Sequence, residues 1–377
     1  MNYVKLKDVC TINMGQSPSS DSYNENGHGV PFFQGNADFG ERYPVTRKWC
    51  SAPTKMAAPE DILISVRAPI GAMNYAKEEC CIGRGLAALT PNREKVAPEY
   101  IFWLLKGKNE ELNCKGTGST FKAIGRNILE ETLVPNISLE KQTECAIILE
   151  KTYRVILSRK QQLQKLDELV KARFVEMFGD VIRNSKSWEI RVLADIASSR
   201  LGKMLDTKQQ TGECSYPYLA NFNVQWFNFN VDNLNQMDFN EAEQKEFELR
   251  DGDLLVCEGG EIGRCAVWHN EIQPCFFQKA LHRVRCNRQL VQPDYLAWWF
   301  KYNCNHGGFA EIAGAKATIA HLPGIKLKQL QVALPPLSLQ NEFAAFVERV
   351  DQQKQTVQQS LEKLELMKKA LMQEYFG

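Results

Sequence analysis

The sequence lacks a strong charge of either sign, paired cysteine motifs and long apolar runs. Lys and Arg total 46 against 45 Asp and Glu in 377 residues, a net charge of +1, which excludes a uniformly basic nucleic-acid coat but allows local basic patches. The 12 cysteines include no CxxC pair, so we expect reduced thiols and neither disulfides nor a zinc site. No apolar run reaches the roughly 18 residues of a membrane span, and residues 1–8 lack a signal-peptide core. We therefore expect a cytoplasmic protein with no membrane partner.

Motifs for catalysis are equally scarce. Gly202-Lys203 is followed by Met204 and lacks the upstream glycine of a nucleotide-binding P-loop. Residues 83–88 match the Gly-x-Gly-x-x-Ala spacing of a dinucleotide-binding motif, but no clear strand precedes them in the sequence. The five histidines show no metal-ligand spacing, and the glycines around Glu258 and Glu261 favour a turn over an acid–base pair. We expect no catalytic residue, no metal ligand and no cofactor in this chain.

The chain repeats itself. A shift of 198 residues places residues 142–179 on 340–377 with thirteen identities and no gap. The shift falls to 195 at Pro98-Glu99-Tyr100, to 192 at Asp61-Ile62-Leu63-Ile64 and to 187 at Leu6. Such a drift indicates loop insertions between fixed elements, so the sequence predicts a tandem duplication.

Two long helices are predicted at the ends of the copies. Residues 140–178 contain neither Pro nor Gly, and apolar residues recur there every seven positions, as they do in the second copy. Each helix would be about 57 Å long. An antiparallel coiled coil is the simplest way to bury both stripes, and a core helix inside each domain is the alternative. The stripe positions are Leu149, Ile156, Leu163, Val170, Val350, Val357, Leu364 and Leu371.

The remaining segments predict mixed α/β domains. Asp61–Val66 and Asp253–Cys257 are typical of buried strands, and Pro98–Leu105 and Pro293–Phe300 are typical of helices opened by Pro and an acid. We predict domains at 1–139 and 180–336, with spacer helices at 140–179 and 337–377. The fold class is therefore α+β, with two tandem mixed α/β domains joined by two long antiparallel coiled-coil helices in a pseudo-twofold duplication.

A protein with two similar heads on a stiff spacer suits duplex DNA, whose groove faces recur every ~34–36 Å. Asn, Gln and Arg pair bidentately with base edges, and they occur in the polar, aromatic stretches 34–49 and 221–226. Ordinary solvated loops remain an alternative for both stretches. The candidates for base readout are Asn36, Arg47, Asn223 and Gln225.

A second group of residues suits phosphate contacts, because cations and backbone amides near glycine bind anions. Several flank the Ile-Gly turns at 70–71 and 262–263, and others surround the Gly-rich segment 116–120 and its counterpart. Ordinary solvated side chains remain the alternative for about half of them. The candidates are Arg67, Arg84, Lys115, Ser119, Lys122, Arg126, Arg264, Lys279, Lys316, Thr318 and His321.

These residues resemble a known family, the specificity subunit of Type I restriction–modification systems, over essentially the whole chain. Residues 252–264, GDLLVCEGGEIGR, are similar to a framework motif of the family's target-recognition domains, and residues 61–71 are a looser version. Residues 334–340, LPPLSLQ, resemble the entry into the family's second conserved helix. Residues 134–142 depart from the double-proline form of that entry.

The resemblance implies that each domain reads one half of a split, asymmetric double-stranded DNA target. The helices would set the unread spacer and dock two methyltransferase subunits, with the stripe residues as the partner-binding positions. The methyltransferase subunits would carry S-adenosylmethionine, and ATP- and Mg-dependent restriction subunits would complete the nuclease. The subunit itself would perform no chemistry. A duplicated scaffold without a DNA role is the rival hypothesis, and the missing cofactor motifs disfavour a self-sufficient restriction–methylation enzyme.

Overall fold

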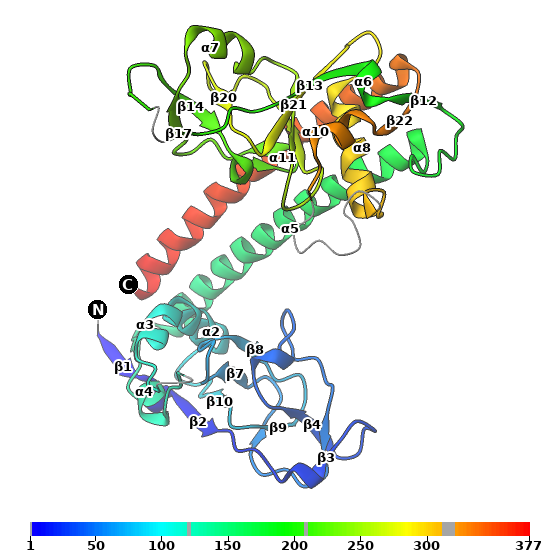
Figure 1. Cartoon of the computed structure of the whole chain (residues 1–377). Helices are drawn as coiled ribbons and strands as arrows, with labels where there is room; N and C mark the ends of the chain where they lie inside the picture. Colours follow the sequence, from blue (N-terminus) through cyan, green and yellow to red (C-terminus); the bar gives the residue numbers. More distant parts are fainter. Residues whose placement is uncertain (1, 119–121, 207–209, 311–320) are drawn as a thin grey trace. The chain divides into compact units, whose positions relative to one another are not determined.

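The computed structural model describes residues 2–118, 122–206, 210–310 and 321–377. The chain forms two compact units, residues 1–161 with 358–377 and residues 162–357 (Figure 1). Two long helices, α5 (Leu139–Phe178) and α11 (Leu337–Phe376), each contribute one part to each unit. The units therefore cut across the predicted division into separate domains and helices.

Unit 1 contains two main sheets. The first has the order β2-β10-β7-β8 and is antiparallel throughout, and the second has the order β3-β5-β4-β9-β6 with β4 and β9 parallel. A third pair joins β1 (Tyr3–Lys5) to β11 (Leu133–Pro135). The other strands are β2 (Cys10–Met14), β3 (Tyr23–Asn24), β4 (Val30–Phe33), β5 (Trp49–Cys50), β6 (Met56–Ala57), β7 (Ile62–Ser65), β8 (Met73–Tyr75), β9 (Cys80–Ile82) and β10 (Leu86–Pro91). The short helices are α1 (Leu6–Val9), η1 (Ser20–Ser22), η2 (Asn36–Asp38), α2 (Pro98–Gly107), α3 (Asn109–Cys114) and α4 (Arg126–Glu130).

Unit 2 repeats this plan. Its four-stranded sheet has the order β13-β21-β18-β19, β14 and β20 pair in parallel beside β17, and β12 pairs with β22. The strands are β12 (Glu189–Val192), β13 (Ala197–Leu201), β14 (Ser215–Leu219), β15 (Val224–Gln225), β16 (Asn228–Phe229), β17 (Asn235–Asp238), β18 (Asp253–Cys257), β19 (Cys265–Val267), β20 (Phe276–Phe277), β21 (Leu281–Cys286) and β22 (Gln331–Leu334). The helices are α6 (Leu193–Ile196), η4 (Asn221–Asn223), α7 (Glu241–Phe247), α8 (Pro293–Asn305) and α10 (Gly324–Lys328).

The structure confirms the duplication and the drifting shift. Gly15 N–H donates to Leu86 in unit 1, as Gly202 N–H donates to Leu281 in unit 2. The four-stranded order also repeats between the units, and β17-β14-β20 repeats the central strands β5-β4-β9 of the five-stranded sheet. The clearest difference is α7, which lies between β17 and β18 in unit 2, where unit 1 has the short strand β6 between β5 and β7.

The two predicted strands are buried on both faces, which explains their continuous apolar runs. Along β7, Ile62 and Ile64 pack into one core cluster while Leu63 packs into another. Side chains alternate between the faces of a strand, so one short segment joins two hydrophobic layers. In β18, Leu254 and Leu255 divide between two clusters in the same way.

The helices predicted at Pro98 and Pro293 are present and extend beyond their predicted ends. Proline stands in the first turn of both α2 and α8, followed by an acid, which suits a helix start because proline needs no hydrogen bond there. Tyr100 and Tyr295 are fully buried at equivalent positions. Each helix covers the apolar face of its four-stranded sheet.

The long helices contact each other inside each unit. In unit 2, Arg173 pairs with Glu342 at 2.8 Å and Asp167 pairs with Lys354 at 2.8 Å, so α5 and α11 run antiparallel there. In unit 1, Lys160 pairs with Glu365 at 2.8 Å. Helix α5 ends where Gly179 takes a φ of +73°, a conformation that favours glycine. A supercoil between the helices stays a prediction.

Candidate nucleic-acid interface

Backbone hydrogen bonds bring four loops of unit 1 side by side. Gly83 N–H donates to Phe33 at 2.8 Å, Val66 N–H donates to Gly85 at 2.9 Å, and Ile124 N–H donates to Val66 at 2.9 Å. A Cβ atom on Gly85 would lie 2.4 Å from the Gln34 carbonyl oxygen, so glycine permits the closest of these approaches. The ends of β4, β7 and β9 therefore meet the segment after residue 121 at one edge of the domain.

This loop cluster carries four of the candidate residues. Arg67, Arg84 and Lys122 are exposed, and Asn36 is half-buried in η2. The Lys122 carbonyl accepts the Ala68 N–H at 3.0 Å, so its backbone is fixed while its ammonium group reaches solvent. Three cations on adjacent loops can contact several phosphates of one strand, which is a positioning function.

Unit 2 builds an equivalent cluster with the same connections. Glu258 N–H donates to Ala280 at 2.9 Å, and Leu322 N–H donates to Glu258 at 2.7 Å, matching the bonds of Val66 and Ile124. Exposed Lys279 therefore occupies the position of Arg84, as the sequence alignment predicted. Exposed His321 bridges to Gly259 where Ala123 bridges to Arg67.

Three further predicted cations lie outside the shared backbone framework. Arg47 is exposed and donates to the Ala37 carbonyl at 3.2 Å. Lys115 and Arg126 are exposed and pair with glutamates four residues away on their own helical segments. Such pairs are worth only ~0.3–0.5 kcal/mol, so a phosphate can replace the glutamate at little cost.

The structure corrects the prediction for Asn223. This side chain is 2% exposed, and its Oδ1 accepts the Ala220 N–H while its Nδ2 donates to the Asn230 carbonyl. Both halves of the amide are committed to the turn η4, so Asn223 shapes its loop and cannot read a base edge. Its neighbour Gln225 is exposed, with Nε2 donating to the Phe222 carbonyl at 3.0 Å.

Arg264 is also placed differently from its prediction. It is half-buried, and its guanidinium donates to the carbonyl and to Oδ1 of Asn221, at 3.0 and 2.7 Å. It does not correspond to Arg67, whose structural counterpart is Gly259. Arg264 therefore positions Asn221 rather than contacting a ligand. The remaining candidates Ser119, Lys316 and Thr318 lie outside the described residues.

Sequence reasoning missed a small polar group beside this cluster. Trp226 Nε1 donates to Glu261 at 2.7 Å, and the Lys301 ammonium lies 4.1 Å from the Trp226 ring centroid. Asn221 Nδ2 also donates to the Gly259 carbonyl at 2.9 Å. The only sequence signal was the composition of residues 221–226, because Glu261 and Lys301 are far from them along the chain.

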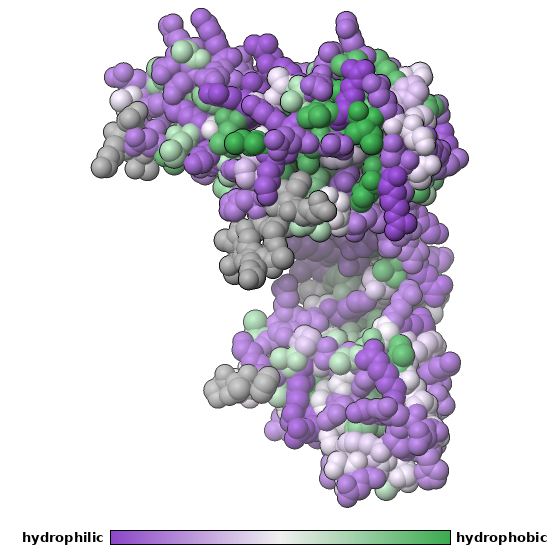
Figure 2. Space-filling view, turned by 45° about the vertical axis from the view of Figure 1, so that its right-hand side comes forward, coloured by the Kyte–Doolittle hydropathy of each residue, from purple (hydrophilic) through white to green (hydrophobic). Residues whose placement is uncertain are grey.

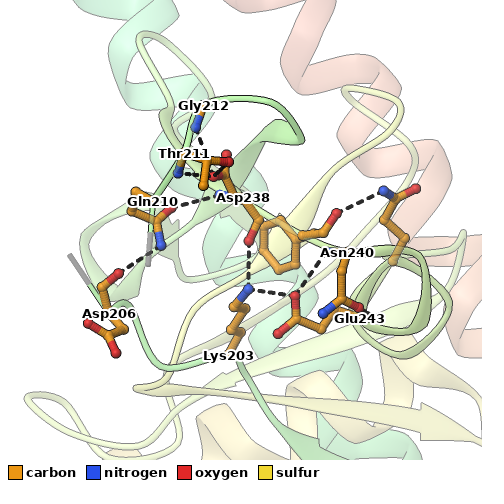
Figure 3. Close-up of polar contacts among 10 residues, drawn as sticks. Lys203, Asp206, Gln210, Thr211, Gly212, Asp238, Asn240 and Glu243 are labelled. Carbon is orange, nitrogen blue, oxygen red and sulfur yellow. Dashed lines mark hydrogen bonds and ion pairs between the residues drawn. The ribbon is translucent and has the colours of Figure 1, made fainter. Parts of the chain in front are cut away.

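A second network fixes the segment that follows β13 (Figure 3). Lys203 Nζ donates to the Asp238 carbonyl and to the Glu243 carboxylate, both at 2.6 Å. The Asp238 carboxylate accepts the N–H groups of Thr211 and Gly212 and the Thr211 hydroxyl. The two backbone N–H groups hold the pKa of Asp238 below its usual value.

This network belongs to the same loop region, because the Lys203 carbonyl accepts the Lys279 N–H at 2.7 Å. Lys203 itself is half-buried and neutralised by Glu243, so it holds the loop in place and is not a free cation for DNA. Unit 1 has Gln16 at the position that Lys203 occupies in unit 2, so this tie is specific to the second domain.

The long helices require a further correction. Leu149, Ile156 and Val170 of α5, and Val350 and Val357 of α11, are buried within this chain and cannot face another subunit. Leu163, Leu364 and Leu371 are half-buried. The exposed large apolar side chains on the two helices are Leu139, Ile147, Val155, Leu169, Val175, Leu366 and Met367.

Figure 2 shows a mostly hydrophilic face with a hydrophobic group on the upper unit, unit 2. Ile182, Ile190 and Ile325 are exposed apolar residues of that unit. Among the described residues, no three His, Cys, Asp or Glu side chains gather as metal ligands. Within the same residues, no helix is long and apolar enough to cross a membrane.

Comparisons with known proteins agree with the repeated plan. A family model described as the Type I restriction modification DNA specificity domain matches residues 1–168 and again residues 185–366. A solved S subunit of a Type I restriction–modification system from M. genitalium has a TM-score of 0.64 at 14% identity, covering 100% of this chain and 96% of that one. This likeness shows the fold alone.

Two curated relatives share parts of the sequence. The putative type I restriction enzyme MjaX specificity subunit of Methanocaldococcus jannaschii is 41% identical over 160 residues, 42% of this chain and 38% of that protein. The chain thus matches well under two thirds of that relative. The type I restriction enzyme EcoBI specificity subunit of Escherichia coli is 20% identical over 382 aligned positions, 93% of this chain and 78% of that one.

Proposed function

Because the chain belongs to the family of the Type I restriction modification DNA specificity domain, we propose that it is the DNA-recognition subunit of such a system. Each globular domain reads one half of a bipartite double-stranded target. The chain performs no catalysis of its own. It directs methyltransferase subunits, which carry S-adenosylmethionine, and restriction subunits, which use ATP and Mg.

The repeated loop cluster is the observation that carries this proposal. The same backbone bonds place Arg84 in unit 1 and Lys279 in unit 2 at equivalent exposed positions, each beside a further cation or histidine. Beside Lys279, unit 2 adds the Lys203 and Asp238 tie, whereas unit 1 has Gln16 at the position of Lys203. A constant phosphate-contacting frame with variable neighbours suits two domains that position alike and read different bases.

The long helices support the rest of the proposal. Most of the predicted stripe is buried inside the chain, Leu149 in the core of unit 1 and Val170 and Val350 in the core of unit 2. Ion pairs also join the two antiparallel helices in unit 2, which supports a paired-helix spacer. The exposed apolar positions, among them Ile147, Val155 and Leu169, are the surface on which two methyltransferase subunits dock.

Methylation mapping tests the proposal. We expect the methylated adenines of a host carrying this chain to show a motif of two fixed blocks around an unread spacer. Deletion of the chain abolishes methylation at this motif, and reintroduction of the chain restores it. Unchanged methylation after deletion would instead favour a duplicated scaffold without a DNA role.

A further inference from the structure

Two buried glutamines stand at equivalent joints of the two units. Gln142 is 2% exposed and Gln340 is fully buried, and both lie in the first turn of a long helix. Buried side-chain amides are retained where their hydrogen bonds are satisfied, because an unpaired polar group is costly.

Each glutamine joins the segment before a domain helix to the start of its own long helix. Gln142 accepts the Ala97 N–H at 2.9 Å, just before α2, and donates to the Ile137 carbonyl at 2.9 Å, just before α5. Gln340 accepts the Gln292 N–H at 2.9 Å, just before α8, and donates to the Pro335 carbonyl at 2.7 Å, just before α11. In each unit, the amide of one glutamine therefore connects the globular domain by hydrogen bonds to the start of the long helix that carries the glutamine.

The end of the other long helix reaches the same place in each unit. Tyr100 of α2 packs against Phe376 of α11 with ring centroids 5.1 Å apart. Tyr295 of α8 packs against Phe178 of α5 with centroids 4.8 Å apart. The two tyrosine hydroxyls also donate to the carbonyls of Pro135 and Ala333.

Each unit thus contains one helix seat, at which one long helix starts and the other ends. The first seat consists of Ala97, Tyr100, Gln142 and Phe376, and the second of Gln292, Tyr295, Gln340 and Phe178. In each seat the tyrosine is fully buried and the glutamine is at most 2% exposed. Neither long helix can therefore tilt relative to its own domain without breaking a buried contact.

We propose that Gln142 and Gln340 are positioning residues that set the spacer length accepted between the two half-sites. This inference rests on the proposed function. Each glutamine fixes the direction in which a long helix leaves its recognition domain. A looser joint lets that domain take several directions, so targets with other spacers are bound at less disadvantage.

The experiment uses the full chain with its methyltransferase subunits, first to obtain the bipartite motif of the wild type. Binding is then measured on duplexes whose spacer is the natural one, one base pair longer or one base pair shorter. We expect Gln142→Leu and Gln340→Leu to lower the preference for the natural spacer by about tenfold. The base preference inside each half-site stays unchanged.

Gln353→Leu is the matched control, because it makes the same substitution at an exposed position of α11 and should keep the wild-type spacing preference. Tyr100→Phe and Tyr295→Phe remove one hydroxyl and keep the ring, so they decide the matter if a glutamine variant does not fold. If the glutamine and tyrosine variants fold and keep the full preference for the natural spacer, the inference is wrong but the proposed function stands. A wild-type chain without a bipartite motif overturns the proposed function, and the inference with it.

Discussion

The cations of the loop clusters are held by their backbones, which leaves their side chains free to meet a ligand. The Lys122 carbonyl accepts the Ala68 N–H, and the Lys279 N–H donates to the Lys203 carbonyl. The base of each side chain is therefore fixed while its charged end is exposed. This arrangement suits phosphate contacts, which need a defined position and no sequence preference.

Replacement of Lys122 by Ala tests this at the level of one residue. We expect weaker binding to every DNA sequence, and a slope of log K against log salt smaller by about 0.9, the value of one released counterion. The measurement is a salt series of binding constants for the full chain with its methyltransferase subunits. Lys363→Ala, at an exposed position of α11, should leave the slope as it is. A Lys122→Ala slope equal to wild type would remove Lys122 from the interface.

Sequence reasoning predicted exposed cations that the structure places on the loops, but it did not show which polar side chains are bound within their own loops. Arg84 and Lys279 were paired by the shift of 195, and backbone bonds confirm their equivalence. The prediction that Asn223 reads a base edge was wrong, because its amide forms hydrogen bonds with the backbone of Ala220 and Asn230. Nothing in the local sequence shows where a short amide side chain points. The side-chain partner of Arg264 likewise comes from a distant segment.

Helix α2 carries a lysine, Lys106, that is half-buried among aromatic rings. The Lys106 ammonium lies 3.9 Å from the Tyr153 ring centroid and 4.9 Å from that of Trp103. Burial, with a smaller contribution from Lys368, lowers the pKa of Lys106 to about 8. The ring faces attract the ammonium and offset part of this cost.

Lys106→Met should therefore stabilise the chain at neutral pH, by about 1–2 kcal/mol after allowance for the rings and for partial exposure. At pH 7 the lysine is charged in the folded and the unfolded chain, so the folded chain bears the cost of burial. As pH rises from about 8 to the ordinary value of 10.5, the folded chain loses the proton first and the cost disappears. The advantage of the variant should therefore shrink over this range.

Urea unfolding midpoints of wild type and variant at pH 7 and pH 10 measure this difference. The comparison between the two proteins removes the titration of cysteines and tyrosines that both share. Lys363→Met is the control, since its side chain is exposed on α11. An advantage that grows with pH would contradict the assignment of the lowered pKa to Lys106.

Strands and helices were predicted well where a local sequence pattern was enough to define them. The role of the apolar stripe on the long helices was predicted less well, because either this chain or a partner could cover it. The apolar runs predicted β7 and β18 with nearly correct bounds. The prolines predicted where α2 and α8 begin, although both helices extend beyond their predicted ends. The sevenfold stripe of the long helices was predicted to bind partner subunits, but most of it is buried within the chain. Apolar residues that recur every seven positions indicate which side chains are buried. They do not indicate whether the same chain or another subunit buries them.

At the scale of the whole molecule, the duplication predicts that the domains read DNA independently. Replacement of residues 1–140 by the corresponding domain of another family member should change one half of the methylated motif only. The other half and the spacer should stay as they are, because unit 2 and its seat at Gln340 are retained. Methylation mapping of the exchanged chain measures both halves at once, and a change in both would contradict independent reading.

The hydrogen bonds of the two glutamines favour the exchange of recognition domains, because they do not depend on which side chains the domain carries there. Gln142 and Gln340 bind only backbone N–H and carbonyl groups, and Ala97 in one unit fills the role that Gln292 fills in the other. On the proposed function, a newly acquired domain needs the right chain path at this point, and an aromatic ring at the position of Tyr100, to fit an old spacer. Recombination can supply new target sequences while the mechanical coupling is inherited intact.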